Sequence, residues 1–123
     1  MRKPQLFIAE AGLKGRGVFT SKGITADTVV EVSPVIVLSK SDRKIVEETM
    51  LYFYLFEWGN RRNQAALGLG YVSMYNHDAL SNCEYIMDYE EKTITIKTTR
   101  RIKAGEELTI NYSAGWHDWE PVW

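Results

Sequence analysis

The strongest constraint on the fold is a strand–turn–strand pattern at residues 85–98. The segment YIMDY precedes a charged turn at 90–92, and TITIKT then alternates strictly between polar and apolar residues. Period-two alternation places the apolar side chains on one face of a strand, so the pattern predicts a β-hairpin with one buried face. ELTINY at 107–112 predicts another short strand, as do QLFIAE at 5–10 and residues 18–19. The Val- and Ile-rich segment 24–38 predicts two strand pieces, because Pro34 interrupts it.

Residues 39–58 have a different character. They begin with Ser and Asp cap candidates, continue with good helix formers, and place Ile45, Met50 and Phe53 or Tyr54 near helical spacing. This predicts a helix, although its second half, LYFYLF, could equally be a buried strand or a loop. Residues 68–85 are irregular and rich in tyrosine, and so long a loop in a small domain is usually functional.

Composition excludes several classes of function. The 123 residues suffice for one domain, and the net charge of −1 disfavours electrostatic capture of nucleic acid. One cysteine and two histidines exclude an internal disulfide and a cysteine-based zinc site, so we expect no metal. No apolar run approaches the ~20 residues of a membrane helix, so we expect an intracellular, cytoplasmic protein without a membrane partner.

Three local features are ambiguous when each is taken alone. Gly15 and Gly17 lie in a strand–turn–strand context, which excludes a dinucleotide fold and leaves either a tight turn or a ligand near the backbone. His77 lies beside Asp78, and a structural or backbone-contacting histidine is favoured over a catalytic base. The seven tyrosines could line a channel for a cation or could fill the core.

Taken in order, three segments resemble the motifs of the SET domain of protein-lysine methyltransferases. These segments are GLKGRGVF at 12–19, YNHD at 75–78 followed by Asn82 and Cys83, and GEELTINY at 105–112. The resemblance covers about residues 5–116 and is to the minimal, stand-alone form found in viruses and bacteria. The sequence departs from the family pattern at Asp78, where Ser is usual, and at Ile110, where many members carry Phe or Tyr.

The resemblance implies a mostly β, β-clip-like fold of several small sheets with one or two short helices. A C-terminal pseudoknot would bring Asn76 and His77 to Tyr112. One SET domain would span 1–123, with a core at about 5–112 and an aromatic tail at 113–123 that completes the active site. Glu107 would anchor the knot rather than act as a base.

The implied activity is S-adenosylmethionine-dependent methyl transfer to the ε-amine of a protein lysine, with S-adenosylhomocysteine as product. The residues implied for catalysis are Tyr112 and Tyr54. Those implied for cofactor binding are Lys14, Gly15, Arg16, Gly17, Asn76, His77, Tyr112 and Trp116. Those implied for the substrate channel are Tyr52, Tyr75, Ile110 and Trp119, and Trp123 could complete this channel or cover a partner's surface.

Two other interpretations stay open at this point. Asp78 and Ile110 favour a non-catalytic SET-like adaptor that binds a cofactor or peptide, whereas the intact Asn-His pair and Tyr112 favour an enzyme. The third is an unrelated small β protein with an aromatic pocket. For the enzyme we expect a homodimer acting on a histone, ribosomal or nucleoid protein, at chromatin if the source is eukaryotic or viral.

Overall fold

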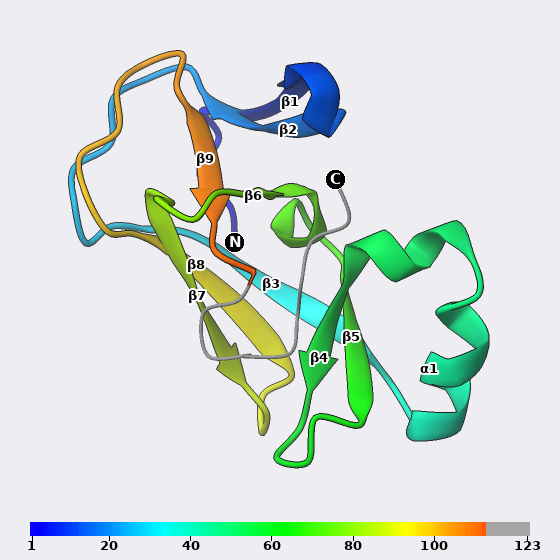
Figure 1. Cartoon of the computed structure of the whole chain (residues 1–123). Coiled ribbons are helices and arrows are strands. Elements are labelled where there is room, and N and C mark those ends of the chain that lie inside the picture. The colour runs from blue at the N-terminus through cyan, green and yellow to red at the C-terminus, as the bar shows by residue number, and fades with distance from the viewer. Residues whose placement is uncertain (113–123) are drawn as a thin grey trace.

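The computed structural model describes residues 1–112, which form two β-sheets and four short helical segments (Figure 1). The four-stranded sheet has the order β1 (Leu6–Glu10), β2 (Arg16–Thr20), β9 (Glu107–Ile110) and β6 (Asn76–His77). The five-stranded sheet has the order β4 (Leu55–Trp58), β5 (Gln64–Gly68), β3 (Val29–Leu38), β8 (Thr93–Thr98) and β7 (Cys83–Asp88). The helical segments are η1 (Gly12–Lys14), α1 (Lys40–Val46), η2 (Met50–Tyr54) and η3 (Val72–Met74). The mostly β class with several small sheets and short helices is confirmed.

The predicted hairpin is strands β7 and β8, paired in antiparallel register from Cys83 opposite Thr98 to Asp88 opposite Thr93. The alternating segment TITIKT has one buried face, as predicted, because Ile94 and Ile96 are both completely buried in the core. The Asp88 carboxylate accepts a hydrogen bond of 2.9 Å from the backbone N–H of residue 91 and closes the turn.

The prediction that Pro34 divides the segment 24–38 into two strand pieces is wrong, because strand β3 continues through Pro34. The strand runs without interruption over ten residues and pairs first with β8, up to Pro34 opposite Thr93, and then with β5, from Val35 opposite Gly68. Pro34 has no N–H to donate, but it lies where pairing passes from one neighbour to the other, and its carbonyl accepts a 3.0 Å bond from Leu69 N. Proline is therefore accommodated inside a central strand.

The helix predicted over 39–58 is confirmed for its first two turns only, and the second half ends in a strand, one of the alternatives that its sequence left open. Helix α1 begins after Ser39, whose hydroxyl accepts a 3.1 Å bond from Asp42 N, and it ends at Val46. Thr49 then caps a separate 3-10 turn, η2, by accepting a 3.2 Å bond from Leu51 N. The chain continues directly into β4, so the aromatic half of the segment forms a 3-10 turn and an edge strand.

Strand β9 carries the C-terminal motif into the middle of the four-stranded sheet, where it is antiparallel to β2 and parallel to β6 (Figure 1). The side chain of Asn82 braces this crossing from the loop before β7. Its amide nitrogen donates a 2.8 Å bond to the Glu107 carbonyl, and its amide oxygen accepts a 2.8 Å bond from Thr109 N. The loop before β7 is thereby tied to the C-terminal strand β9.

No helix within residues 1–112 has both the length and the apolar character needed to cross a membrane.

Candidate active site

Two cavities meet at Tyr112. The wide cavity, of about 390 Å³, is lined by Lys14, Gly15, Arg16, Met50, Phe53, Tyr54, Ser73, Met74, Asn76 and Tyr112. The narrow cavity, of about 20 Å³, is lined by Phe53, Tyr54, Leu55, Phe56, Glu57, Ser73, Tyr75, Tyr85 and Tyr112. Four residues belong to both walls, namely Phe53, Tyr54, Ser73 and Tyr112. The boundary between the cavities is therefore formed by η2, η3 and the residues just after β9.

The position of Tyr112 is fixed by three hydrogen bonds. Its hydroxyl donates a 2.7 Å bond to the carbonyl of Tyr75, and its backbone N–H donates a 3.0 Å bond to Nδ1 of His77. Its own carbonyl accepts a 3.4 Å bond from the hydroxyl of Tyr85. Burial raises the pKa of Tyr112, with a smaller effect from the nearby Glu107 carboxylate, so its hydroxyl stays protonated at neutral pH.

The hydrogen bond from Tyr112 N also indicates the protonation state of His77. Nδ1 must be unprotonated to accept this hydrogen bond, and desolvation lowers the pKa of His77, which favours the neutral ring. His77 therefore orients the backbone at the end of β9 and has the backbone-contacting role that its sequence context favoured.

The wall of the wide cavity joins three strands through polar contacts. Asn76 donates a 3.1 Å bond to the carbonyl of Arg16 and a 2.8 Å bond to the Glu107 carboxylate, which links β6 to β2 and β9. Lys14 Nζ donates a 3.2 Å bond to the carbonyl of His77. Gly17 is required here because a Cβ at this position would lie 2.7 Å from Asn76 Nδ2 and even closer to the Glu107 carboxylate. Glu107 thus has a bracing role, as the sequence analysis predicted.

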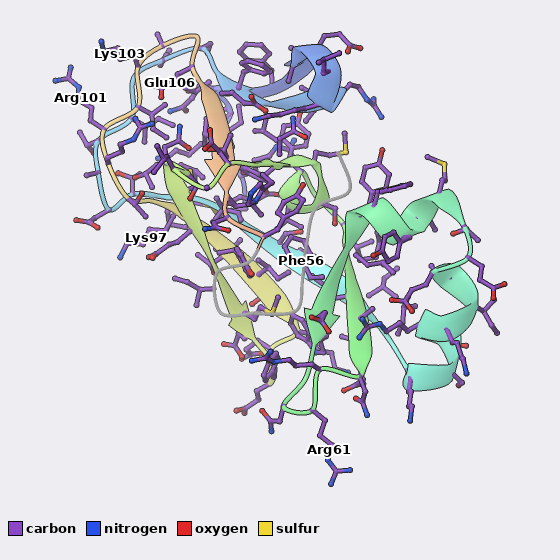
Figure 2. The ribbon with its side chains drawn as sticks, viewed as in Figure 1. Phe56, Arg61, Lys97, Arg101, Lys103 and Glu106 are labelled. Carbon is purple, nitrogen blue, oxygen red and sulfur yellow. The ribbon has the colours of Figure 1, made fainter. Side chains whose placement is uncertain are left out.

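The narrow cavity has mostly aromatic walls, to which both edge strands of the five-stranded sheet contribute one ring each. The rings of Phe56 on β4 and Tyr85 on β7 have centroids 5.5 Å apart, and Figure 2 labels Phe56 on its strand. Burial raises the pKa of Tyr85, so its phenol stays protonated at neutral pH. A passage with such walls suits a slender chain with an apolar stem and a polar tip.

The structure brings most of the predicted site residues together, although it places some elsewhere. Tyr54, Tyr75 and Tyr112 line the narrow cavity, and Lys14, Gly15, Arg16 and Asn76 line the wide one. Gly17 and His77 support this wall through the contacts described above. Tyr52 lines neither cavity and packs edge-on against Phe53 with ring centroids 5.6 Å apart, and Ile110 is completely buried in the core. Trp116, Trp119 and Trp123 lie outside the described residues.

Sequence reasoning did not assign several residues of the cavity walls to the site, nor Glu31 behind them. These wall residues are Met50, Phe53, Leu55, Phe56, Glu57, Ser73, Met74 and Tyr85. The predicted helix gave no reason to place Phe53 and Phe56 at a site. Tyr85 lies in the predicted hairpin, outside the three sequence motifs. Glu31 did carry a signal, because it is an acidic residue in the middle of a Val- and Ile-rich strand.

Comparison with known proteins identifies the family. The SET domain family matches residues 15–113. The chain belongs to this family. Among curated relatives, a Schizosaccharomyces pombe histone-lysine N-methyltransferase, H3 lysine-37 specific, is 40% identical over 120 residues, which cover 97% of this chain and 78% of the relative. Histone-lysine N-methyltransferase 2D of Homo sapiens is 30% identical over 123 residues, a match that covers 94% of this chain but 2% of that much longer protein.

The fold of this SET domain also has a counterpart among solved structures. The crystal structure of a candidate histone methyltransferase from Plasmodium falciparum superposes with a TM-score of 0.68 at 24% identity, covering 94% of this chain and 98% of that one. The family match and the relatives confirm the resemblance inferred from the three sequence motifs. They also confirm the predicted enzyme class, protein-lysine methyltransferase.

Proposed function

We propose that this SET domain transfers a methyl group from S-adenosylmethionine to the ε-amine of a lysine in a histone. The observation that carries the proposal is the pair of cavities that share Tyr112, Tyr54, Phe53 and Ser73 as a common wall. An in-line displacement requires donor and acceptor to approach from opposite sides of the transferring carbon. Two cavities of unequal width that meet at one wall supply such an arrangement.

The wide cavity fits the cofactor in size and in the kinds of group on its wall. Its volume of about 390 Å³ lies within the range of small-molecule sites. Lys14 supplies a cation for a carboxylate, the backbone at 15–16 supplies polar groups, and Asn76 supplies an amide. Met74 and Phe53 supply apolar surface. When bound, S-adenosylmethionine supplies an activated methyl group on a sulfonium, and the protein needs no nucleophile or metal of its own.

The narrow cavity fits the side chain of lysine. A free lysine has a pKa near ~10.4 and is therefore mostly charged at neutral pH, whereas the nucleophile must be the neutral amine. Partly buried aromatic walls disfavour the ammonium by desolvation and limit the access of water, although the Glu57 carboxylate at the same cavity acts in the opposite sense on the charge. We assign to Tyr112 the role of orienting the amine and to Tyr54 that of a second wall residue at the junction.

The substrate class is proposed from the relatives. The S. pombe protein is named for lysine 37 of histone H3 and matches nearly the whole of this chain. We therefore propose a histone substrate and a site of action at chromatin. The homodimer stays a prediction from the small size of the domain, and ribosomal or nucleoid substrates become the alternatives that the experiment distinguishes.

The test begins with calorimetric titration of the purified protein with S-adenosylmethionine, which requires no knowledge of the substrate. Transfer of labelled methyl groups to recombinant histones, to ribosomal proteins and to a nucleoid protein then follows. Tyr112→Phe removes one hydroxyl and should lower the transfer rate by about a hundredfold, while cofactor affinity stays nearly unchanged. Tyr89→Phe is the matched control, because Tyr89 is 39% exposed at the end of the hairpin and lines neither cavity.

Three results would contradict the proposal in different ways. A folded protein that does not bind S-adenosylmethionine would refute the cofactor. Labelling of the other substrates but not of histones would refute the histone assignment alone. A Tyr112→Phe variant as active as Tyr89→Phe would remove Tyr112 from its assigned role.

A further inference from the structure

A buried carboxylate lies behind the active site, outside both cavities. Glu31 on β3 is 1% exposed, and it lines neither the wide nor the narrow cavity. One oxygen accepts a 2.9 Å bond from the hydroxyl of Tyr75, and the other accepts a 2.8 Å bond from the backbone N–H of Tyr71. Gly70 leaves room for this group, since a Cβ there would collide with the Glu31 carboxylate.

Burying a carboxylate is costly, and here its cost is offset by neutral donors. Desolvation raises the pKa of Glu31, while the bonds from Tyr75 and Tyr71 oppose this effect. Arg2 contributes a weaker attraction, and its guanidinium stacks 3.7 Å above the centre of the Tyr71 ring. An apolar side chain would fill this place at a lower desolvation cost. The presence of a carboxylate at this position is therefore explained by the groups that it holds in place.

Tyr75 connects this carboxylate to the reacting centre. Its ring is 1% exposed, its hydroxyl is bonded to Glu31, and its carbonyl accepts the 2.7 Å bond from the Tyr112 hydroxyl. Tyr112 lines both cavities and its hydroxyl is bonded to the Tyr75 carbonyl, so the direction of this carbonyl influences where the hydroxyl points. Anchoring both ends of Tyr75 leaves this carbonyl little freedom to rotate.

We infer that Glu31 is a positioning residue for methyl transfer, which holds the hydroxyl of Tyr112 in place through Tyr75. The inference rests on the proposed function, because it assumes that Tyr112 orients the amine. Glu31 touches neither cavity, so it acts on the rate of the chemical step and not on the binding of cofactor or substrate. Misplacement of an aligned group by about 1 Å costs up to about a hundredfold in rate.

The first experiment compares three substitutions by steady-state kinetics and calorimetry. Glu31→Leu removes both acceptors and should lower kcat at least about tenfold, with KM for the peptide and Kd for S-adenosylmethionine nearly unchanged. Glu31→Gln retains an oxygen for Tyr71 N and an amide that can bond the Tyr75 oxygen, so it should recover most of the lost rate. Val30→Ala is the control for lost stability, because Val30 is a completely buried neighbour on the same strand.

The second experiment tests the route through Tyr75. If Glu31 acts through Tyr75, the Glu31→Leu/Tyr75→Phe double variant should be no slower than the slower single variant. The ¹³Cζ resonance of Tyr112, assigned by its loss in Tyr112→Phe, should shift in Glu31→Leu but not in Val30→Ala. This NMR measurement needs no turnover, so it separates failure of this inference from failure of the proposed function.

Two results would overturn the inference. One is a kcat for Glu31→Leu that falls no further than that of Val30→Ala at temperatures well below both unfolding transitions. The other is an additive loss in the double variant together with an unmoved Tyr112 resonance. Either would make Glu31 a group that contributes to folding alone.

Discussion

Replacing Asn82 with alanine should destabilise the crossing of β9 through the molecule. Asn82 is 2% exposed, and both polar atoms of its side chain are bonded to the backbone of β9, at Glu107 O and Thr109 N, each at 2.8 Å. A buried polar group left without a partner costs about 1–3 kcal/mol. The Glu107 carbonyl oxygen has a second lone pair, whereas the Thr109 N–H has a single hydrogen, which loses its acceptor in Asn82→Ala. We therefore expect the free energy of unfolding to fall by about 3 kcal/mol in total, mostly because of Thr109 N.

This loss converts into a measurable shift of the unfolding temperature. A chain of 123 residues has an unfolding entropy of about 0.26 kcal/mol/K, so a loss of about 3 kcal/mol lowers Tm by about 12 °C. Calorimetric scanning measures the shift, and urea titration shows whether the m-value is unchanged, as a purely native-state effect requires. Amide hydrogen exchange supplies the residue-specific check, because Thr109 N should lose protection more than other core amides.

Two further substitutions make the test sharp. Asn82→Asp retains an oxygen for Thr109 N but turns a second oxygen toward the Glu107 carbonyl and toward the Glu106 carboxylate, which lies 3.4 Å from Asn82 Nδ2. It should therefore be no more stable than Asn82→Ala at neutral pH. Asn60→Ala, at an exposed turn, should change stability by less than about 0.5 kcal/mol. A Tm drop for Asn82→Ala of less than about 4 °C, or rescue by Asp, would refute the brace.

Gly17→Ala should weaken S-adenosylmethionine binding in calorimetry, because the new Cβ would lie 2.7 Å from Asn76 Nδ2 and displace that side chain. Gly23→Ala is its control, with a nearest contact of 3.6 Å, and equal affinities of the two variants would show that the close packing is unimportant. Acidification should destabilise the protein through His77, whose folded pKa lies below its ordinary value near 6.5. Between the two pKa values, the unfolded chain binds a proton on His77 that the folded chain does not. The contribution of neutral His77 to stability is therefore complete above pH ~6.5 and is lost as the pH falls through the folded pKa. His77→Asn keeps an acceptor for Tyr112 N without titrating, so Tm of the wild type should fall more steeply between pH 7 and 5 than that of the variant, and parallel curves would refute this account.

Elements whose environment is set by their neighbours in the chain could be predicted from the sequence. The hairpin β7–β8 has a clean alternation and a short turn, so register follows from local pattern alone. The segment 39–58 could not be predicted in this way, because its helix formers continue past Val46. The helix is held there by hydrogen bonds to a distant part of the chain. The Arg43 side chain donates bonds of 2.7 and 3.0 Å to the carbonyls of Arg62 and Gln64. The second half instead pairs as β4 with β5 and buries Leu55 and Trp58, and this tertiary burial outweighs helix propensity.

The same distinction applies to the site. The SET motifs indicate candidate residues of the site, but not the pairs that they form, because these pairs join residues far apart in the sequence. The His77–Tyr112 bond and the Glu31–Tyr75 bond join residues 35 and 44 positions apart. The first bond accompanies the parallel pairing of β6 with β9, which places Asn76 opposite Thr109 and His77 opposite Ile110. A two-residue parallel strand has no local sequence signal.

The pairing of β6 with β9 also supports the proposed location of methyl transfer. A parallel pair of two residues is weak by itself, yet it is held by side chains from both ends, Asn76 on the Glu107 carboxylate and His77 on Tyr112 N. The chain thus uses polar side chains, in place of a long ladder, to fix the relative position of two motifs. Because Tyr112 follows directly after this pair, each of these contacts limits where its hydroxyl can point. Loosening any of them should therefore affect the rate of methyl transfer before it affects the fold.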